Sequence, residues 1–122
     1  MAVIESRISP TSETFQANRA AMLALVARQA GLEERARRAS AAAGPRFHER
    51  GQLLPRERIA LLLDPGAPFL ELSTLSGFMM DVPDAEKSVP GSGVIAGIGL
   101  VSGVRCMVSA SDSGIDAGAL QP

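Results

Sequence analysis

The sequence predicts an α/β chain in which one long helix and one short helix precede the first strands of a β-sheet. Three observations predict this order. A seam of small and aliphatic side chains runs along the first fifty residues, a proline-led helical segment follows near residue 55, and two aliphatic runs flank a Ser-Gly pair near the other end. Helices are therefore expected before the main strands.

The long helix is expected to begin near residue 11 and to stop at Gly44-Pro45. Thr11 or Ser12 can accept a hydrogen bond from a first-turn amide, and glycine can supply a left-handed cap before proline removes a donor. The seam comprises Met22, Leu25, Gln29, Leu32, Ala36, Ala39 and Ala43. Because this seam is shallow, we expect the helix to lie along the body of its own protein, with a partner-binding arm as the alternative.

A shorter helix is expected from Leu54-Pro55 to Leu63, because proline fits the first turn of a helix. Asp64-Pro65-Gly66 then ends it, and residues 69–72 favour one strand. Residues 77–90 contain prolines and three acidic side chains, which indicate a solvated loop and not a metal site. These acidic residues are Asp81, Asp84 and Glu86.

Two aliphatic runs, residues 94–101 and 104–110, predict a β-hairpin that turns at Ser102-Gly103. The runs are almost continuously apolar, a pattern that is typical of a sheet covered on both faces. Two helices cannot cover both faces of such a sheet. The sequence therefore predicts either an incomplete domain or a hairpin that is buried against another chain.

Composition excludes several classes of function. The chain has 122 residues, 12 basic and 13 acidic side chains and a net charge of -1, so it lacks the basic footprint of a nucleic-acid binder. The apolar runs, such as residues 59–63, are too short to span a membrane. We expect neither nucleic acid nor membrane as a partner, and the lone thiol of Cys106 favours a cytoplasmic location.

The two parts of the chain differ in charge. Residues 1–50 hold eight arginines and five glutamates, whereas residues 51–122 hold four basic and eight acidic groups. This asymmetry can favour docking of one part on the other or docking of a partner, although an exposed ion pair contributes only about 0 to 1 kcal/mol.

The candidate functional residues each have a simpler structural interpretation. The segment Gly97-Ile98-Gly99 and the glycines around it lack the spacing of a dinucleotide fingerprint. Its glycines are therefore expected to let strands approach neighbouring backbone. His48 is expected in a solvated linker, and Cys106 is expected to be a small, inert, buried group, with Arg105 on the opposite strand face. One histidine and one cysteine cannot build a zinc site of the usual kind, and the chain has no Ser-His-Asp arrangement.

Asp112 and Asp116 stand four residues apart, the spacing at which two carboxylates can form an acid-base pair. Gly114 and Gly118 indicate a turn at this place, so we expect the two aspartates to stabilise turns. The residues thus predict no catalytic side chain and no metal ligand in this chain, and they leave cofactor-binding residues undetermined.

Several blocks of sequence resemble one family in the same order. They are Gly51-Gln52-Leu53-Leu54-Pro55-Arg56-Glu57-Arg58-Ile59, Leu62-Leu63-Asp64-Pro65-Gly66, Phe69-Leu70-Glu71-Leu72, Gly93-Val94-Ile95-Ala96-Gly97-Ile98-Gly99, Val101-Ser102-Gly103-Val104-Arg105-Cys106 and Ser111-Asp112. From about Arg19 to the end, the chain resembles the carboxyltransferase (beta) subunit of biotin-dependent acyl-CoA carboxylases, in the methylcrotonyl-, geranyl- and propionyl-CoA branch. Ser111 and Ala117-Gly118 depart from the asparagine and the paired glycines that are usual there.

The resemblance implies the fold and the domains. Residues 1–50 would form an N-terminal helical segment, and residues 51–122 would form the first part of the N-terminal acyl-CoA carboxyltransferase domain, which is crotonase-like. The chain would then be an N-terminal fragment, since subunits of this family extend several hundred residues further.

The resemblance also implies the chemistry. Carboxybiotin would donate a carboxyl group to an acyl-CoA while backbone amides stabilise the enolate, and the glycine-rich loops that supply these amides would lie beyond Pro122. Biotin would be carried by the biotin carboxylase/biotin carrier (alpha) subunit, other copies of the beta subunit would be further partners, and a eukaryotic protein would lie in the mitochondrial matrix. The fragment alone is predicted to be inactive. The alternative function is that of a small non-catalytic interaction protein built from a helix and a hairpin.

Overall fold

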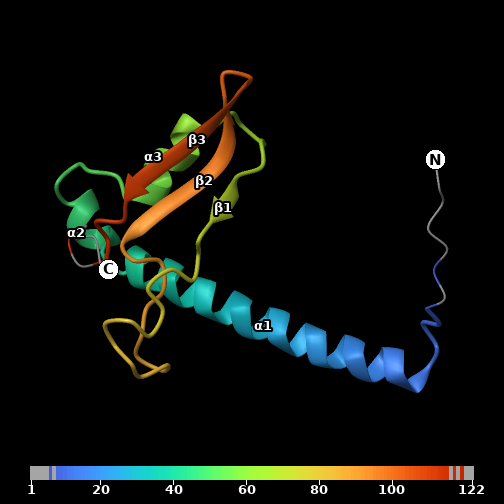
Figure 1. Ribbon diagram of the computed structural model, residues 1–122. Helices are drawn as coiled ribbons and strands as arrows, with labels where there is room; N and C mark the ends of the chain where they lie inside the picture. The colour runs from blue at the N-terminus through green and yellow to red at the C-terminus, as the bar shows by residue number, and fades with distance from the viewer. Residues whose placement is uncertain (1–5, 7, 116, 118, 120–122) are drawn as a thin grey trace. The chain divides into compact units, whose positions relative to one another are not determined.

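The computed structural model describes residues 6, 8–115, 117 and 119. Along the chain the elements are α1 (Glu13–Ala41), α2 (Gly44–His48), α3 (Pro55–Leu62), β1 (Leu70–Leu72), β2 (Val94–Val101) and β3 (Val104–Ser111), as Figure 1 shows. The chain forms two compact units, Met1–Gly31 and Leu32–Pro122. Among the helices of the described residues, none has the length and apolar character that a membrane span needs.

The ends of α1 follow from local hydrogen bonding. The N–H of Phe15 donates to the hydroxyl of Ser12 at 3.3 Å, which confirms a serine cap. The prediction that Gly44-Pro45 stops this helix with a left-handed cap is wrong, because α1 ends at Ala41 and Gly44 is the first residue of α2. Proline is accommodated in the first turn of α2, where the missing donor has no helical partner to lose.

The seam along α1 is buried only in the second unit. There Ala36 is 7% exposed, and Leu32, Ala39 and Ala43 are half-buried. In the first unit Met22 and Leu25 are each 60% exposed. The expectation that the helix lies along the body of its own protein is therefore confirmed from Leu32 onward, and it stays a prediction for the preceding residues. The difference arises because the first unit contains no other described helix or strand.

The sheet is antiparallel with the order β1-β2-β3, as Figure 1 shows. Its hairpin turns at Ser102 and Gly103, whose φ angles of 51° and 76° are those of a tight type I′ turn. The N–H groups of both residues donate to the carboxylate of Asp64, at 2.6 Å and 2.7 Å. The predicted hairpin is confirmed, and its turn is tied to the segment that ends α3.

One face of the sheet carries the core. Ile59 of α3 packs there with Ile95 and Val108, which are 1% and 8% exposed. Cys106 is half-buried against this cluster, in agreement with its expected role as a small apolar group. A Cβ atom at Gly97 would lie 2.6 Å from the carbonyl oxygen of Leu70, so this glycine does permit close approach of two strands.

The other face of the sheet is open among the described residues. Leu70, Ile98 and Met107 occupy one cross-strand row on β1, β2 and β3, and they are 61%, 36% and 65% exposed. Among the described residues, α3 covers one face of the sheet, whereas the aliphatic composition of the strands predicts two covered faces. The second cover remains a prediction about polypeptide outside this chain.

Candidate functional site

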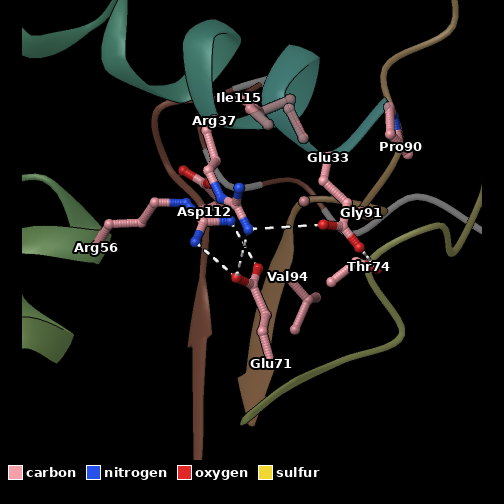
Figure 2. Close-up of a pocket in the computed structure, with 12 residues that line it drawn as sticks. Glu33, Arg37, Arg56, Glu71, Thr74, Pro90, Gly91, Val94, Asp112 and Ile115 are labelled. Atoms are coloured by element: carbon pink, nitrogen blue, oxygen red, sulfur yellow. Dashed lines mark hydrogen bonds and ion pairs between the residues drawn. The ribbon is translucent and has the colours of Figure 1, made fainter. Parts of the chain in front are cut away.

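Glu71 of β1 is the centre of a partly buried network of charged side chains in the second unit (Figure 2). Its carboxylate accepts two hydrogen bonds from the guanidinium of Arg56, at 2.7 Å and 3.0 Å, and its side chain is only 16% exposed. Such a paired contact fixes direction as well as distance. Arg56 lies in the first turn of α3, so the pair joins that helix to the sheet.

Arg37 extends this network to α1. One nitrogen of its guanidinium lies 3.9 Å from Glu71 and 3.8 Å from Glu33, one helical turn earlier. Glu33 in turn accepts a hydrogen bond at 2.9 Å from the hydroxyl of Thr74, just after β1. One set of charged side chains therefore holds together the last turns of α1, the start of α3 and the end of β1.

Asp112 adds a second buried contact to α1. It is 3% exposed, and its carboxylate accepts a hydrogen bond from the hydroxyl of Ser40 at 2.6 Å and from the N–H of Gly114 at 3.2 Å. The bond from Gly114 confirms that Asp112 stabilises a turn. Asp116, the other member of the sequence pair, lies outside the described residues. Ser40 carries no sequence signal, since a serine within a helix usually faces solvent.

The electrostatics of this network favour the charged form of Arg56. The hydrogen bonds from Arg56 to Glu71 raise the pKa of the arginine, burial opposes this, and the charges of Glu71 and Asp112 add to it. Arginine is protonated at every accessible pH, so it serves as a fixed cation and not as an acid or base. Its Nε is the one buried side-chain nitrogen or oxygen without a hydrogen-bond partner among the described residues.

The cavity enclosed by the network is too small for a cofactor. Its volume is about 10 Å³, which is room for roughly one water molecule. A larger depression, of about 620 Å³, lies between α3 and β3 and is an open surface groove. No three or more histidine, cysteine or acidic side chains among the described residues form a metal-binding group. The network around Glu71 thus leaves no room for a cofactor between its own side chains, and it is a structural clasp that joins α1, α3 and β1.

His48 forms a contact that the sequence interpretation missed. Its Nε2 lies 3.1 Å from both carboxylate oxygens of Glu57, and Glu57 also accepts the N–H of Leu54 at 2.7 Å at the start of α3. These hydrogen bonds, that from His48 first, lower the pKa of Glu57. His48 is exposed, as expected, but it belongs to α2 and links that helix to α3.

Comparison with known proteins identifies related sequences. Residues 46–122 match the carboxyl transferase domain family. The chain is 44% identical over 98 residues to the biotin-dependent 3-methylcrotonyl-coenzyme A carboxylase beta1 subunit of Mycobacterium tuberculosis, over 80% of this chain and 16% of that subunit. It is 36% identical over 124 residues to the mitochondrial methylcrotonoyl-CoA carboxylase beta chain of Arabidopsis thaliana, over 98% of this chain and 20% of that one.

Two solved structures are similar in fold. The beta subunit of geranyl-CoA carboxylase from P. aeruginosa aligns with 98% of this chain and 22% of its own, with a TM-score of 0.86 and 51% identity. The transcarboxylase 12S hexamer, solved with methylmalonyl-coenzyme A, aligns with 75% of this chain and 19% of its own, with a TM-score of 0.57 and 26% identity.

The chain spans about a sixth to a fifth of the length of the carboxylase subunits that it matches. The predicted fold class, an α/β chain in which a long N-terminal helix precedes the start of a crotonase-like carboxyltransferase domain, is confirmed by these likenesses. The match over residues 46–122 and the agreement of the backbone with two carboxyltransferases lead to one conclusion: the chain belongs to the carboxyl transferase domain family.

Proposed function

We propose that this chain is the N-terminal part of the carboxyltransferase subunit of an acyl-CoA carboxylase, which transfers a carboxyl group from carboxybiotin to an acyl-CoA such as methylcrotonyl-, geranyl- or propionyl-CoA. The observation that carries the proposal is the alignment of 98% of the chain with the geranyl-CoA carboxylase beta subunit at 51% identity. A likeness of that extent covers the helices and the hairpin together and not one motif alone.

The described residues have a supporting role in this proposal. The clasp around Glu71 holds α1, α3 and β1 together, and Asp64 holds the hairpin turn. Residues 51–122 would thus begin the N-terminal carboxyltransferase domain, and residues 1–50 would precede it as a helical segment. The acyl-CoA and biotin sites would be built by polypeptide that the relatives have in addition to this stretch. The open sheet face, with Leu70, Ile98 and Met107, would pack against that polypeptide.

The proposed partners are those of the relatives' assemblies. A biotin carboxylase/biotin carrier (alpha) subunit would supply biotin, and other copies of the beta subunit would complete the active site. The names of the relatives support this, because they describe beta subunits and a hexamer. The location would be the cytoplasm, or the mitochondrial matrix in a eukaryote; the relatives from Arabidopsis thaliana and Drosophila melanogaster are named as mitochondrial.

A chimera tests the proposed function. The segment of the P. aeruginosa geranyl-CoA carboxylase beta subunit that aligns with this chain is replaced by residues 1–122, and carboxyl transfer from carboxybiotin to geranyl-CoA is measured. We expect activity within about tenfold of the parent subunit, since half of the exchanged residues are identical. A chimera of parental assembly size and melting temperature that transfers no carboxyl group to any of the three acyl-CoAs would contradict the proposal.

The 122-residue chain alone is expected to transfer no carboxyl group, because it spans only about a fifth of the subunits that it matches and the acyl-CoA and biotin sites would be built by the rest of such a subunit. The same assay on the purified chain, with carboxybiotin and each acyl-CoA, checks this. Any turnover above that of the buffer would show that the chain is itself catalytic.

A further inference from the structure

The small cavity beside the clasp has the size and the lining of a site for a single water molecule. Its volume is about 10 Å³, and a water molecule requires roughly 10 to 15 Å³ of such space together with two to four polar partners. All of its lining residues belong to the second unit. We call it the clasp cavity, and its polar lining residues are Glu33, Arg37, Arg56, Glu71, Thr74 and Asp112.

One donor of the clasp requires an acceptor. Both hydrogen bonds from Arg56 to Glu71 use the terminal guanidinium nitrogens, Nη1 and Nη2. The Nε–H lies on another edge of this planar group and takes no part in that pair. The Nε atom is buried, and it has no hydrogen-bond partner among the described residues. Since buried donors in folded proteins are almost always satisfied by protein or by ordered water, the Nε–H indicates a bound molecule.

Asp112 lines the same cavity and can accept further hydrogen bonds. Its side chain is only 3% exposed, and the bonds from Ser40 and Gly114 both fall on Oδ1. A carboxylate offers about four acceptor positions, so Oδ2 keeps acceptor capacity. The charge of Asp112 helps to raise the pKa of Arg56, and Figure 2 shows the two groups beside each other. A donor and an acceptor therefore border one small space.

The charges around the clasp cavity favour a neutral occupant. Three carboxylates disfavour an anion there, and two guanidinium groups disfavour a cation. A water molecule is neutral, accepts a hydrogen bond through a lone pair and donates two through its protons. We propose that the clasp cavity binds one water molecule, which accepts the Nε–H of Arg56 and donates to the carboxylate of Asp112.

This water closes a ring of polar contacts through four elements. From Asp112, directly after β3, the ring continues to Ser40 of α1. From Arg56 of α3 it passes through Glu71 of β1 to Arg37 of α1. Arg37 and Ser40 precede the residues 46–122 that match the family, so the ring joins α1 to that domain. The inference goes beyond the proposed function and does not depend on it, because it concerns the interior of the second unit.

Nuclear magnetic resonance of the isotope-labelled 122-residue chain tests the contact at the proton itself. The measurement is the rotating-frame cross-peak between Hε of Arg56 and water, because its sign separates cross-relaxation with a bound water from proton exchange. We expect a cross-relaxation peak for Arg56. Arg58, an exposed residue of the same helix, is the matched control, and its Hε should show no such peak because surface water exchanges rapidly.

A substitution that fills the cavity gives a second measurement. Val94 lines the clasp cavity, and Val94→Ile adds one methyl group there. A methyl group that displaces the water cannot accept the Nε–H of Arg56. We therefore expect the cross-peak to vanish and the melting temperature to fall by about 4 to 8 °C. In a dry cavity the same methyl group would improve packing and raise the melting temperature.

Arg56→Lys separates loss of the water from overpacking by the methyl group. Lysine keeps the positive charge and has a methylene group in place of Nε, so the donor is removed. In the Arg56→Lys background, Val94→Ile should lower the melting temperature by less than half as much as it does in the unmodified chain. Overpacking would lower it equally in both backgrounds.

Val104→Ile is the control for the added methyl group, because Val104 lies in β3 and is 61% exposed. It should change neither the cross-peak nor the melting temperature. The proposal is overturned by an Arg56 Hε with no more contact to water than that of Arg58, or by a cross-peak that persists in Val94→Ile. A higher melting temperature of Val94→Ile, or an equal fall in both backgrounds, would also overturn it.

Discussion

Arg56 and Glu71 form two parallel hydrogen bonds, at 2.7 Å and 3.0 Å, across 15 residues of sequence. The pair joins the first turn of α3 to the middle of β1, and Arg37 approaches the same carboxylate from α1. A single acidic side chain thus connects three elements. Its removal is expected to affect the second unit as a whole.

Glu71→Gln is expected to lower the free energy of unfolding by about 1 to 3 kcal/mol, because the half-buried guanidinium of Arg56 loses its opposite charge. Urea denaturation of the chain measures this. Glu34→Gln, on the exposed side of α1, is the control and should change the value by less than about 0.5 kcal/mol. Equal effects of the two substitutions would mean that the clasp does not stabilise the fold.

Acid is expected to remove the contribution of Glu57 to the stability of the fold. Hydrogen bonds from His48 and from the N–H of Leu54 lower the pKa of Glu57 below its ordinary value of 4.5. A lowered pKa in the folded state stabilises the fold above the unfolded pKa, and this stability is lost as the pH falls through the folded pKa. The stability difference between the unmodified chain and Glu57→Gln should therefore shrink below pH 4.5, as denaturation at several pH values would show. His48→Ala lacks the donor. When Glu57→Gln is added to His48→Ala, the resulting change in the free energy of unfolding should depend less on pH.

Gly97→Ala is expected to destabilise the sheet by about 1 to 3 kcal/mol, because overpacking forces the backbone or the neighbouring side chains to move. The added Cβ would meet the carbonyl oxygen of Leu70 and the ring of Phe69. Gly31→Ala is the matched control, because no atom beyond its chain neighbours and the backbone of its own helix lies within 4 Å of the added Cβ. Within a helix it should stabilise the chain by up to about 1 kcal/mol. Thermal melts compare the two, and a neutral Gly97→Ala would contradict the close approach of β1 and β2.

The purified chain is expected to aggregate through its open sheet face and the exposed edge of β3. Met107→Glu should reduce light scattering of fresh protein without lowering its melting temperature, because this side chain is 65% exposed and lies in the row with Leu70 and Ile98. Leu61→Glu, at a residue of α3 that is 74% exposed, is the control. If both substitutions reduce scattering equally, added charge and not the sheet face accounts for the effect.

Local signals predict much of the fold. The start of α3 at Pro55, the turn at Ser102-Gly103 and the two hairpin strands agree with the structure, because proline geometry, a tight turn and aliphatic runs act over a few residues. The stop at Gly44-Pro45 was the exception. Glycine before proline is compatible both with the end of one helix and with the first turn of the next, and only the packing of α2 distinguishes them.

The sequence by itself determined the order of the elements, the hairpin and the family, through short-range chemistry and through motifs that stand in a set order. The tertiary structure alone decided which polar and charged side chains meet. Ser40 and Asp112 are 72 residues apart and Thr74 and Glu33 are 41 apart, so no local pattern pairs them. It also decided that the apolar residues of α1 before Leu32 are exposed, because burial depends on which element lies opposite a side chain and not on the side chain itself.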